Sequence, residues 1–347
     1  MDPRQPDAQQ PDPIRHFHPV LAARDLRKAP VRVELAGRRY VLFRDGTGQA
    51  AALVDRCPHR FAPLSAGKVR PDGRLACPYH GWNFDAQGHC DIPSRATLAK
   101  CDIPAFQVVE RAGYLWLAAP STPLSALPQM EFEGYTLAGH FSMVFEAPLH
   151  VAIDNFSEDE HTPYVHTRLG WDEPSFGGVE YECRNLEDRS EVHYRAPQRW
   201  TFAQHLLPIR RGDYFHNDWV TRFDPVRTEF NLHWSDAAGN PRPLWIKAPI
   251  YMVPETPRLT RFHVFTYLKL THRRLAALTP LLGKVLMRMV RHEIAADARF
   301  IPTVADTPFE LNGMKLGRFD KPLAHQRKLL KAIYWGQAAE EAQTQAG

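Results

Sequence analysis

The chain has 347 residues, 44% of them hydrophobic and 24% charged, with a formal net charge of +4. This is the composition of an ordinary soluble protein with enough apolar residues for two domains, and the even spread of Lys and Arg argues against nucleic-acid binding. No uncharged apolar run is long enough for a membrane span and the start has no secretory signal pattern, so we expect a cytoplasmic protein.

The first third of the sequence favours β-structure. Residues 1–36 are expected to be a tail and a leading segment, and residues 37–120 a first domain. The runs VRVELA, RYVLFRD and QAAALVD follow one another with glycine-containing turns between them, and strand character returns at residues 106–119. Short strands joined by tight turns predict a small antiparallel sheet or barrel. A domain boundary is then marked by Pro120, Pro123 and Pro128.

The remaining residues, 121–347, predict a mixed domain. Residues 149–166 have helical spacing, although Pro163 must kink or end that helix. Residues 190–270 are strand-like, and apolar residues recur at helical spacing from about residue 273 to residue 300. A long helix packed on an antiparallel sheet makes this an α+β domain.

The strongest motif is a pair of short segments, Cys57-Pro58-His59 and Cys77-Pro78-Tyr79-His80. A Rieske [2Fe–2S] centre needs two Cys on one iron and two His on the other, and two such loops side by side supply them. A zinc site is the alternative, but zinc fingers usually pair Cys with Cys and His with His along the chain. The odd count of five cysteines argues against a disulfide framework, so we expect unpaired thiols at Cys90, Cys101 and Cys183.

The surroundings of both segments resemble the Rieske domains of ring-hydroxylating oxygenases. The resemblance rests on Cys57-Pro-His-Arg, Cys77-Pro-Tyr-His-Gly-Trp82, Phe84-Asp85 and Gly88. It implies that the cluster is held by Cys57, His59, Cys77 and His80. Gly81 and Trp82 are expected to shape the second loop.

A second motif, Asn155-x-x-Glu158-x-x-His161-x4-His166, follows the domain boundary. Two His and one carboxylate on one face of iron(II) form the facial triad of non-haem oxygenases. Taken alone, the two His are open to another interpretation, as surface or capping residues. With the Cys/His motif upstream, the order resembles the terminal oxygenase subunits of Rieske non-haem iron systems, of the ring-hydroxylating and demethylase type. This implies that His161 and His166 bind a mononuclear Fe(II).

The third iron ligand of that family lies on a late helix, which matches HEIAADARFIP here. The resemblance points to Asp297. Glu293 lies one helical turn earlier on the same face and is the competitor, and Asp306 is a weaker rival.

Asn155 and Glu158 are the predicted catalytic residues. The family usually has Asp at the position of Glu158, and that carboxylate links a Rieske His of one subunit to an iron-ligand His of the next. Glu158 is expected to take this role, with Asp159 or Asp154 as substitutes and an ordinary salt-bridged Glu as the alternative. A relay between subunits implies a homotrimer.

The resemblance implies an N-terminal all-β Rieske domain followed by an antiparallel-sheet, helix-grip catalytic domain. The implied enzyme uses O2, and electrons from NAD(P)H delivered by a ferredoxin or flavin reductase, to monooxygenate, hydroxylate or demethylate a small cyclic or aromatic substrate. An electron carrier without oxygenase chemistry and a non-catalytic partner subunit stay open, but neither needs the second set of ligands. Some aromatic residues are candidates for lining an apolar pocket, although most are expected to be core residues: Trp200, Phe202, Phe215, Trp219, Phe223, Trp234 and Tyr251.

Overall fold

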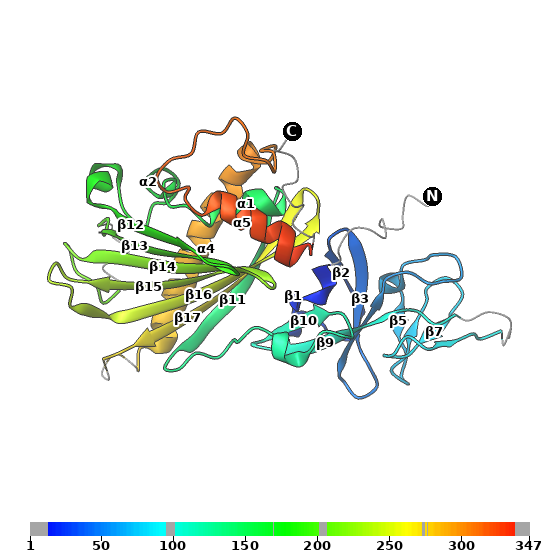
Figure 1. The fold of residues 1–347 in the computed structure, drawn as a ribbon. Helices are drawn as coiled ribbons and strands as arrows, with labels where there is room; N and C mark the ends of the chain where they lie inside the picture. Colours follow the sequence, from blue (N-terminus) through cyan, green and yellow to red (C-terminus); the bar gives the residue numbers. More distant parts are fainter. Residues whose placement is uncertain are drawn as a thin grey trace, which may run out of the picture. The chain divides into compact units, whose positions relative to one another are not determined.

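The computed structural model describes residues 13–94, 101–168, 170–200, 207–272, 275 and 277–336, and it divides the chain into two compact units (Figure 1). The N-terminal unit includes the described residues up to Met130, and the C-terminal unit begins at Glu131. The N-terminal unit therefore extends on both sides of the expected range 37–120. Of the described helices, none is long and apolar enough to cross a bilayer.

The N-terminal unit is built on a six-stranded antiparallel sheet with the strand order β1-β10-β9-β4-β3-β2. The strands are β1 (His18–Ala22), β2 (Val31–Leu35), β3 (Arg38–Arg44), β4 (Ala50–Val54), β9 (Ala105–Arg111) and β10 (Tyr114–Ala118). The expected leading segment thus supplies β1 and β2. Strand β1 pairs with the distant β10, a long-range contact that the local sequence pattern does not show.

A second, small sheet has the order β5-β6-β7-β8. Its strands are β5 (Lys68–Val69), β6 (Leu75–Ala76), β7 (Asn83–Phe84) and β8 (Cys90–Asp91), and 3-10 turns in this unit are η1 (Pro13–Arg15), η2 (Ala23–Asp25), η3 (Leu64–Ala66) and η4 (Leu124–Ala126). Leu75 and Phe84 of this sheet pack with Leu53 and Leu64 in one buried cluster. The loops between these short strands are therefore fixed to the core of the unit.

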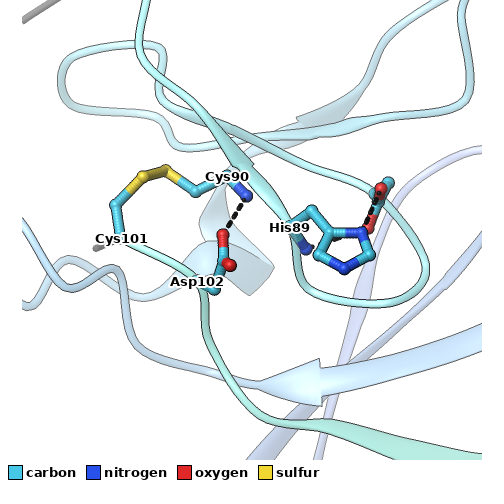
Figure 2. The surroundings of a disulfide bond; sticks show 5 residues. His89, Cys90, Cys101 and Asp102 are labelled. Atoms are coloured by element: carbon cyan, nitrogen blue, oxygen red, sulfur yellow. Dashed lines mark hydrogen bonds and ion pairs between the residues drawn. A yellow bond between two sulfur atoms is a disulfide. The ribbon is translucent and has the colours of Figure 1, made fainter. Parts of the chain in front are cut away.

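A disulfide joins Cys90 on β8 to Cys101 (Figure 2). The prediction of unpaired thiols at these two positions is wrong, whereas Cys183 is free. The two segments are tied together by bonds from the Cys90 N–H to Asp102 Oδ1 (2.8 Å) and from the Ile103 N–H to the Gly88 carbonyl (3.0 Å). These bonds bring the two Cα atoms to 5.5 Å, the ordinary separation for a disulfide.

The C-terminal unit is built on a seven-stranded antiparallel sheet with the order β11-β17-β16-β15-β14-β13-β12. The strands are β11 (Thr136–Phe145), β12 (Glu180–Asn185), β13 (Arg189–Pro197), β14 (Tyr214–Phe223), β15 (Val226–Ser235), β16 (Pro241–Thr256) and β17 (Leu259–Leu270). Helix α4 (Thr279–Phe300) lies along this sheet and packs on β11 and β17 (Figure 1). The predicted α+β class, with a long helix on an antiparallel sheet, is confirmed.

The helix expected over residues 149–166 is two separate helices, α1 (Leu149–Asn155) and α2 (Thr162–Val165). Pro163 lies in the first turn of α2, where proline is tolerated because no N–H is needed there. The expected continuous helix, kinked or ended at Pro163, is therefore wrong, because Pro163 opens a helix. The remaining helical segments are α5 (Leu323–Leu329), η5 (Glu173–Gly178), η7 (Ile301–Val304) and the π-helical η8 (Leu330–Tyr334).

Candidate metal centres

Two loops of the N-terminal unit, each beginning at a predicted cluster cysteine, share one backbone pattern. The Cys57 N–H donates to the carbonyl of Ala62 (2.9 Å), and the Phe61 N–H donates back to the Cys57 carbonyl (2.9 Å). The loop that starts at Cys77 repeats both bonds, at 2.8 Å and 3.2 Å. The fourth residue after each Cys has a positive φ, 61° at Phe61 and 71° at Gly81. The chain therefore builds the same tight turn twice.

Each loop presents one thiol and one imidazole. Cys57 and Cys77 are buried, while His59 and His80 are exposed at the loop tips with their ring centroids 4.4 Å apart. The His59 ring stacks on Trp82 at 4.7 Å. Burial raises the pKa of Cys57 to about 11, with a further rise from the adjacent thiol of Cys77. Two neighbouring buried sulfurs and two neighbouring outer imidazoles match the donor set of a Rieske cluster.

The second set of predicted ligands is assembled around helix α2. His161 immediately precedes this helix and His166 immediately follows it, while Asp297 comes from the last turns of α4. The Nε2 atoms of the two His are 3.1 Å apart, and each lies 3.5 Å from Asp297 Oδ1. The structure therefore brings together the three residues that the sequence proposed as iron ligands.

The spacing of these three atoms suits one metal ion. Ligand atoms bonded at about 2.1 Å are about 3.0 Å apart at right angles and about 3.4 Å apart at tetrahedral angles. Asp297 is buried, and its Oδ1 has no hydrogen-bond partner among the described residues. A buried carboxylate oxygen without a partner, facing two imidazole nitrogens, fits a metal ligand.

Two further carboxylates contact the far sides of the imidazoles. Glu158 accepts a hydrogen bond from His161 Nδ1, and Glu293 Oε2 lies 2.9 Å from His166 Nδ1. Burial lowers the pKa of His161, but Glu158 and Asp297 raise it more, to about 9. Such carboxylate–histidine pairs orient metal-binding imidazoles and turn Nε2 towards the ion.

The competing carboxylates are engaged elsewhere. Glu293 faces Nδ1 of His166, outside the space between the two Nε2 atoms. Asp306 is 87% exposed and pairs with an arginine. Asp154 pairs with Arg327, and the buried Asp159 accepts a bond from Thr162 (2.6 Å). Among the acidic residues considered from the sequence, Asp297 alone lies between the two imidazoles.

A cavity of about 140 Å³ opens beside these ligands. One wall comes from α1 and α4, and the other from inward-facing residues of β14, β15 and β16. Of the aromatic residues proposed for a pocket, Phe215 and Trp219 line it, and Phe202 lies outside the described residues. The lining is mostly apolar: Phe156, Phe215, Trp219, Phe230, Leu232, Ala248, Ile250, Val290 and Ile294.

Comparison with known proteins decides the nature of the N-terminal unit. Residues 16–102 match the family profile described as "Rieske [2Fe-2S] domain". This part of the chain is a Rieske domain. The profile spans both loops, so Cys57, His59, Cys77 and His80 all lie inside the Rieske domain.

Oxygenases are among the sequence relatives of the chain. Chlorophyllide a oxygenase of Chlamydomonas reinhardtii is 34% identical over 174 residues, which cover 47% of this chain and 26% of the relative. The oxygenase component of dicamba O-demethylase from Stenotrophomonas maltophilia is 33% identical over 151 residues, covering 41% of this chain and 44% of the relative. The chain thus aligns with less than half of the length of these relatives.

The likeness in structure extends beyond the Rieske domain. A crystal structure of dicamba monooxygenase bound to dicamba matches 93% of this chain and 98% of its own chain, with a TM-score of 0.77 and 18% identity. The chain therefore has the fold of dicamba monooxygenase, with a Rieske domain followed by an antiparallel-sheet domain. The resemblance to terminal oxygenase subunits that the motifs indicated is confirmed.

Two residues that support the second site were not identified from the sequence. Arg199 donates to the backbone carbonyls of Pro163 (3.2 Å), His166 (2.5 Å) and Trp171 (2.6 Å), so it fixes the loop that carries His166. Asn217 lies on the cavity wall. The sequence carries a signal only for Asn217, a polar residue in an alternating row of buried side chains.

Proposed function

We propose that this chain is a Rieske-type oxygenase that uses O2 and supplied electrons to oxidise a small cyclic or aromatic substrate. The observation that carries the proposal is the arrangement of His161, His166 and Asp297 beside an apolar cavity, in a chain that also has a Rieske domain. An electron carrier needs the cluster residues alone. It has no use for a three-residue metal site beside a cavity.

In this proposal His161, His166 and Asp297 hold mononuclear Fe(II), which supplies the chemistry that activates O2. Glu158 and Glu293 hold the two imidazoles with Nε2 facing inwards. Asn155, the other proposed catalytic residue, lines the cavity together with Asp297. Burial raises the pKa of Asp297, and the imidazoles of His166 and His161 oppose this rise. The apolar walls hold the substrate and exclude water from the reacting atoms.

The supply of electrons is part of the proposal. Cys57, His59, Cys77 and His80 hold the cluster, which a ferredoxin or flavin reductase reduces with electrons from NAD(P)H. The name of one relative, an oxygenase component, supports a separate reductase. We also propose that the protein is cytoplasmic and forms a homotrimer, in which the cluster of one subunit serves the iron of the next.

Glu158 is the proposed link between neighbouring subunits. It already contacts one imidazole of the iron site, which is half of the contact that a bridge requires. Glu158→Ala should therefore slow single-turnover electron transfer between the centres more than it empties the iron site. Unchanged transfer would leave Glu158 with the orienting role alone.

The decisive experiment exposes the reduced, iron-loaded protein to nitric oxide and records its electron paramagnetic resonance spectrum. An oxygenase should give the signal of a high-spin iron–nitric oxide adduct in addition to that of the reduced cluster. His161→Ala should lose the first signal and keep the second. A wild-type spectrum that contains the cluster signal alone would favour the electron carrier.

A further inference from the structure

The inner row of strand β14 contains a polar residue, Asn217, whose side-chain oxygen has no hydrogen-bond partner within the described part of the chain. Buried and less buried positions alternate along β14, and the buried row runs Phe215, Asn217, Trp219, Thr221, Phe223. Thr221 pairs with Thr228 at 3.1 Å. By contrast, the Asn217 oxygen, Oδ1, is unpaired among the described residues although Asn217 is only 9% exposed.

Trp219, two residues further along the same row, shows the same feature. It is 2% exposed, and its Nε1–H also lacks a partner among the described residues. Both Asn217 and Trp219 line the cavity beside the metal site. Buried polar groups without partners are costly, and in native proteins they usually meet a water or a ligand. The residues of this wall therefore include one indole N–H donor and one amide oxygen acceptor that the described residues leave unpaired.

The charge of the cavity restricts that molecule further. Three carboxylates, those of Glu158, Glu293 and Asp297, already lie on its lining, and none of the described lining residues is Lys or Arg. With Fe(II) bound, two positive charges face these three carboxylates, so the lining keeps a net negative charge that disfavours an anionic group. A neutral molecule avoids this penalty.

We propose that the substrate is a neutral, mainly apolar ring compound with a polar edge. Its acceptor, such as a carbonyl oxygen, accepts a hydrogen bond from the Trp219 Nε1–H, and a donor, such as an N–H, binds Asn217 Oδ1. The apolar face of the ring lies against Phe230 and Leu232 of β15, which line the cavity beside β14. This names the substrate class of the oxygenase site and so rests on the proposed function.

The test compares three bicyclic probes: phthalimide, which is neutral with an N–H and two carbonyls; indane, a hydrocarbon; and indane-1-carboxylate, an anion. Dissociation constants are measured by isothermal titration calorimetry on the full chain loaded with Fe(II), without oxygen or reductant. Phthalimide should bind at least about tenfold more tightly than either of the others, because each satisfied buried hydrogen bond is worth about a factor of ten. If phthalimide has no advantage, the inference is wrong.

Variants separate recognition from structure. Asn217→Leu and Trp219→Phe should each weaken phthalimide about tenfold and leave indane unchanged. Asn217→Leu should also raise the melting temperature, because it removes a buried group without a partner. The control Phe230→Leu should weaken phthalimide and indane alike. Phthalimide binding that is unchanged in both Asn217→Leu and Trp219→Phe would overturn the inference.

These measurements need no turnover. Probe selectivity in a protein without the nitric oxide signal would refute the oxygenase and retain the polar edge of the cavity. The nitric oxide signal without probe selectivity would support the oxygenase and refute the polar edge of the cavity. The two proposals can therefore fail separately.

Discussion

The two metal-binding regions of this chain are built in opposite ways. In the Rieske domain, each loop carries its own Cys and His within a few residues, and the same backbone turn is formed after Cys57 and after Cys77. At the second site, two His flank one short helix, while the carboxylate comes from the distant α4. When a site is made of local loops, almost all of its residues can be recognised from the sequence. A site assembled by the fold can be recognised only in part.

The supporting contacts differ in the same way. The cluster loops are held by their own backbone hydrogen bonds and a positive φ at the fourth residue. The imidazoles of the second site are held from outside by Glu158 and Glu293, and the backbone at His166 is held by Arg199. Changes near the cluster should therefore act on local stability, and changes around the second site should act on metal affinity.

The largest effect is expected at Asp297. Asp297→Ala should abolish the binding of the mononuclear iron and leave the visible spectrum of the cluster intact, because the two sites share no ligand. Glu293→Gln should retain the iron with about 10- to 100-fold lower affinity, as expected for a residue that only orients an imidazole. Metal analysis of both variants, with Asp306→Ala as a neutral control, checks this. If Glu293→Gln loses the iron while Asp297→Ala retains it, Glu293 is the ligand.

The second-largest effect is expected from loss of the disulfide between Cys90 and Cys101. Cys90→Ser removes a cross-link between residues that are 11 positions apart in sequence. The unfolded chain then gains conformational entropy, and this should lower the free energy of unfolding by about 3 kcal/mol. Urea unfolding followed by cluster absorbance measures this change. Cys183→Ser, which removes an unpaired thiol, should have little effect. Equal stability of Cys90→Ser and the wild type would show that the bond does not form in solution.

The metal affinity of the second site should depend on pH. Burial lowers the pKa of His161, yet Glu158 and Asp297 raise it to about 9. Since a metal binds only the neutral imidazole, one proton must leave, and the affinity for Co(II) should rise about tenfold per pH unit below pH 9 and level off above it. Glu158→Gln should move this plateau to lower pH. A flat profile in the wild type would contradict the contact between Glu158 and His161.

The smallest effects concern the paired cluster loops. A Cβ at Gly81 would meet only Pro93 Cγ, at 3.8 Å, so Gly81→Ala is sterically possible. With a φ of 71°, the substitution should still cost about 1–2 kcal/mol of stability. Phe61→Gly relieves the same backbone penalty but loses the contact with Arg56, 3.7 Å from the ring centroid, so its net effect should be small. Urea unfolding of both variants tests whether the loops are equivalent.

The sequence predicted the elements whose information is local. The strand runs of the first domain, the α+β class and the presence of a Rieske domain all follow from motifs or periodicity within short windows. Long-range pairing was missed: β1 joins the sheet through β10, and Cys90 meets Cys101 because their flanking segments hydrogen-bond to one another. An odd cysteine count did not exclude one bonded pair.

The second site shows the same limit. Helical spacing placed Glu293 and Asp297 on one face of α4, but only the fold shows that Asp297 faces both Nε2 atoms while Glu293 faces His166 Nδ1. Pro163 was expected to kink or end a helix, and instead it opens α2. Asn217 could not be assigned to the site from the sequence, because one polar residue in an alternating strand does not show that its side chain faces a cavity. The roles of these residues in metal and substrate binding remain predictions.

The central claim is that one chain holds two separate iron centres, and the most direct test is the content of iron and acid-labile sulfide in protein purified without oxygen. A Rieske cluster together with a mononuclear site predicts about three irons and two sulfides per chain. About two irons and two sulfides, unchanged after Fe(II) is added, would contradict the account. The chain would then be an electron carrier, and His161, His166 and Asp297 would be ordinary polar residues.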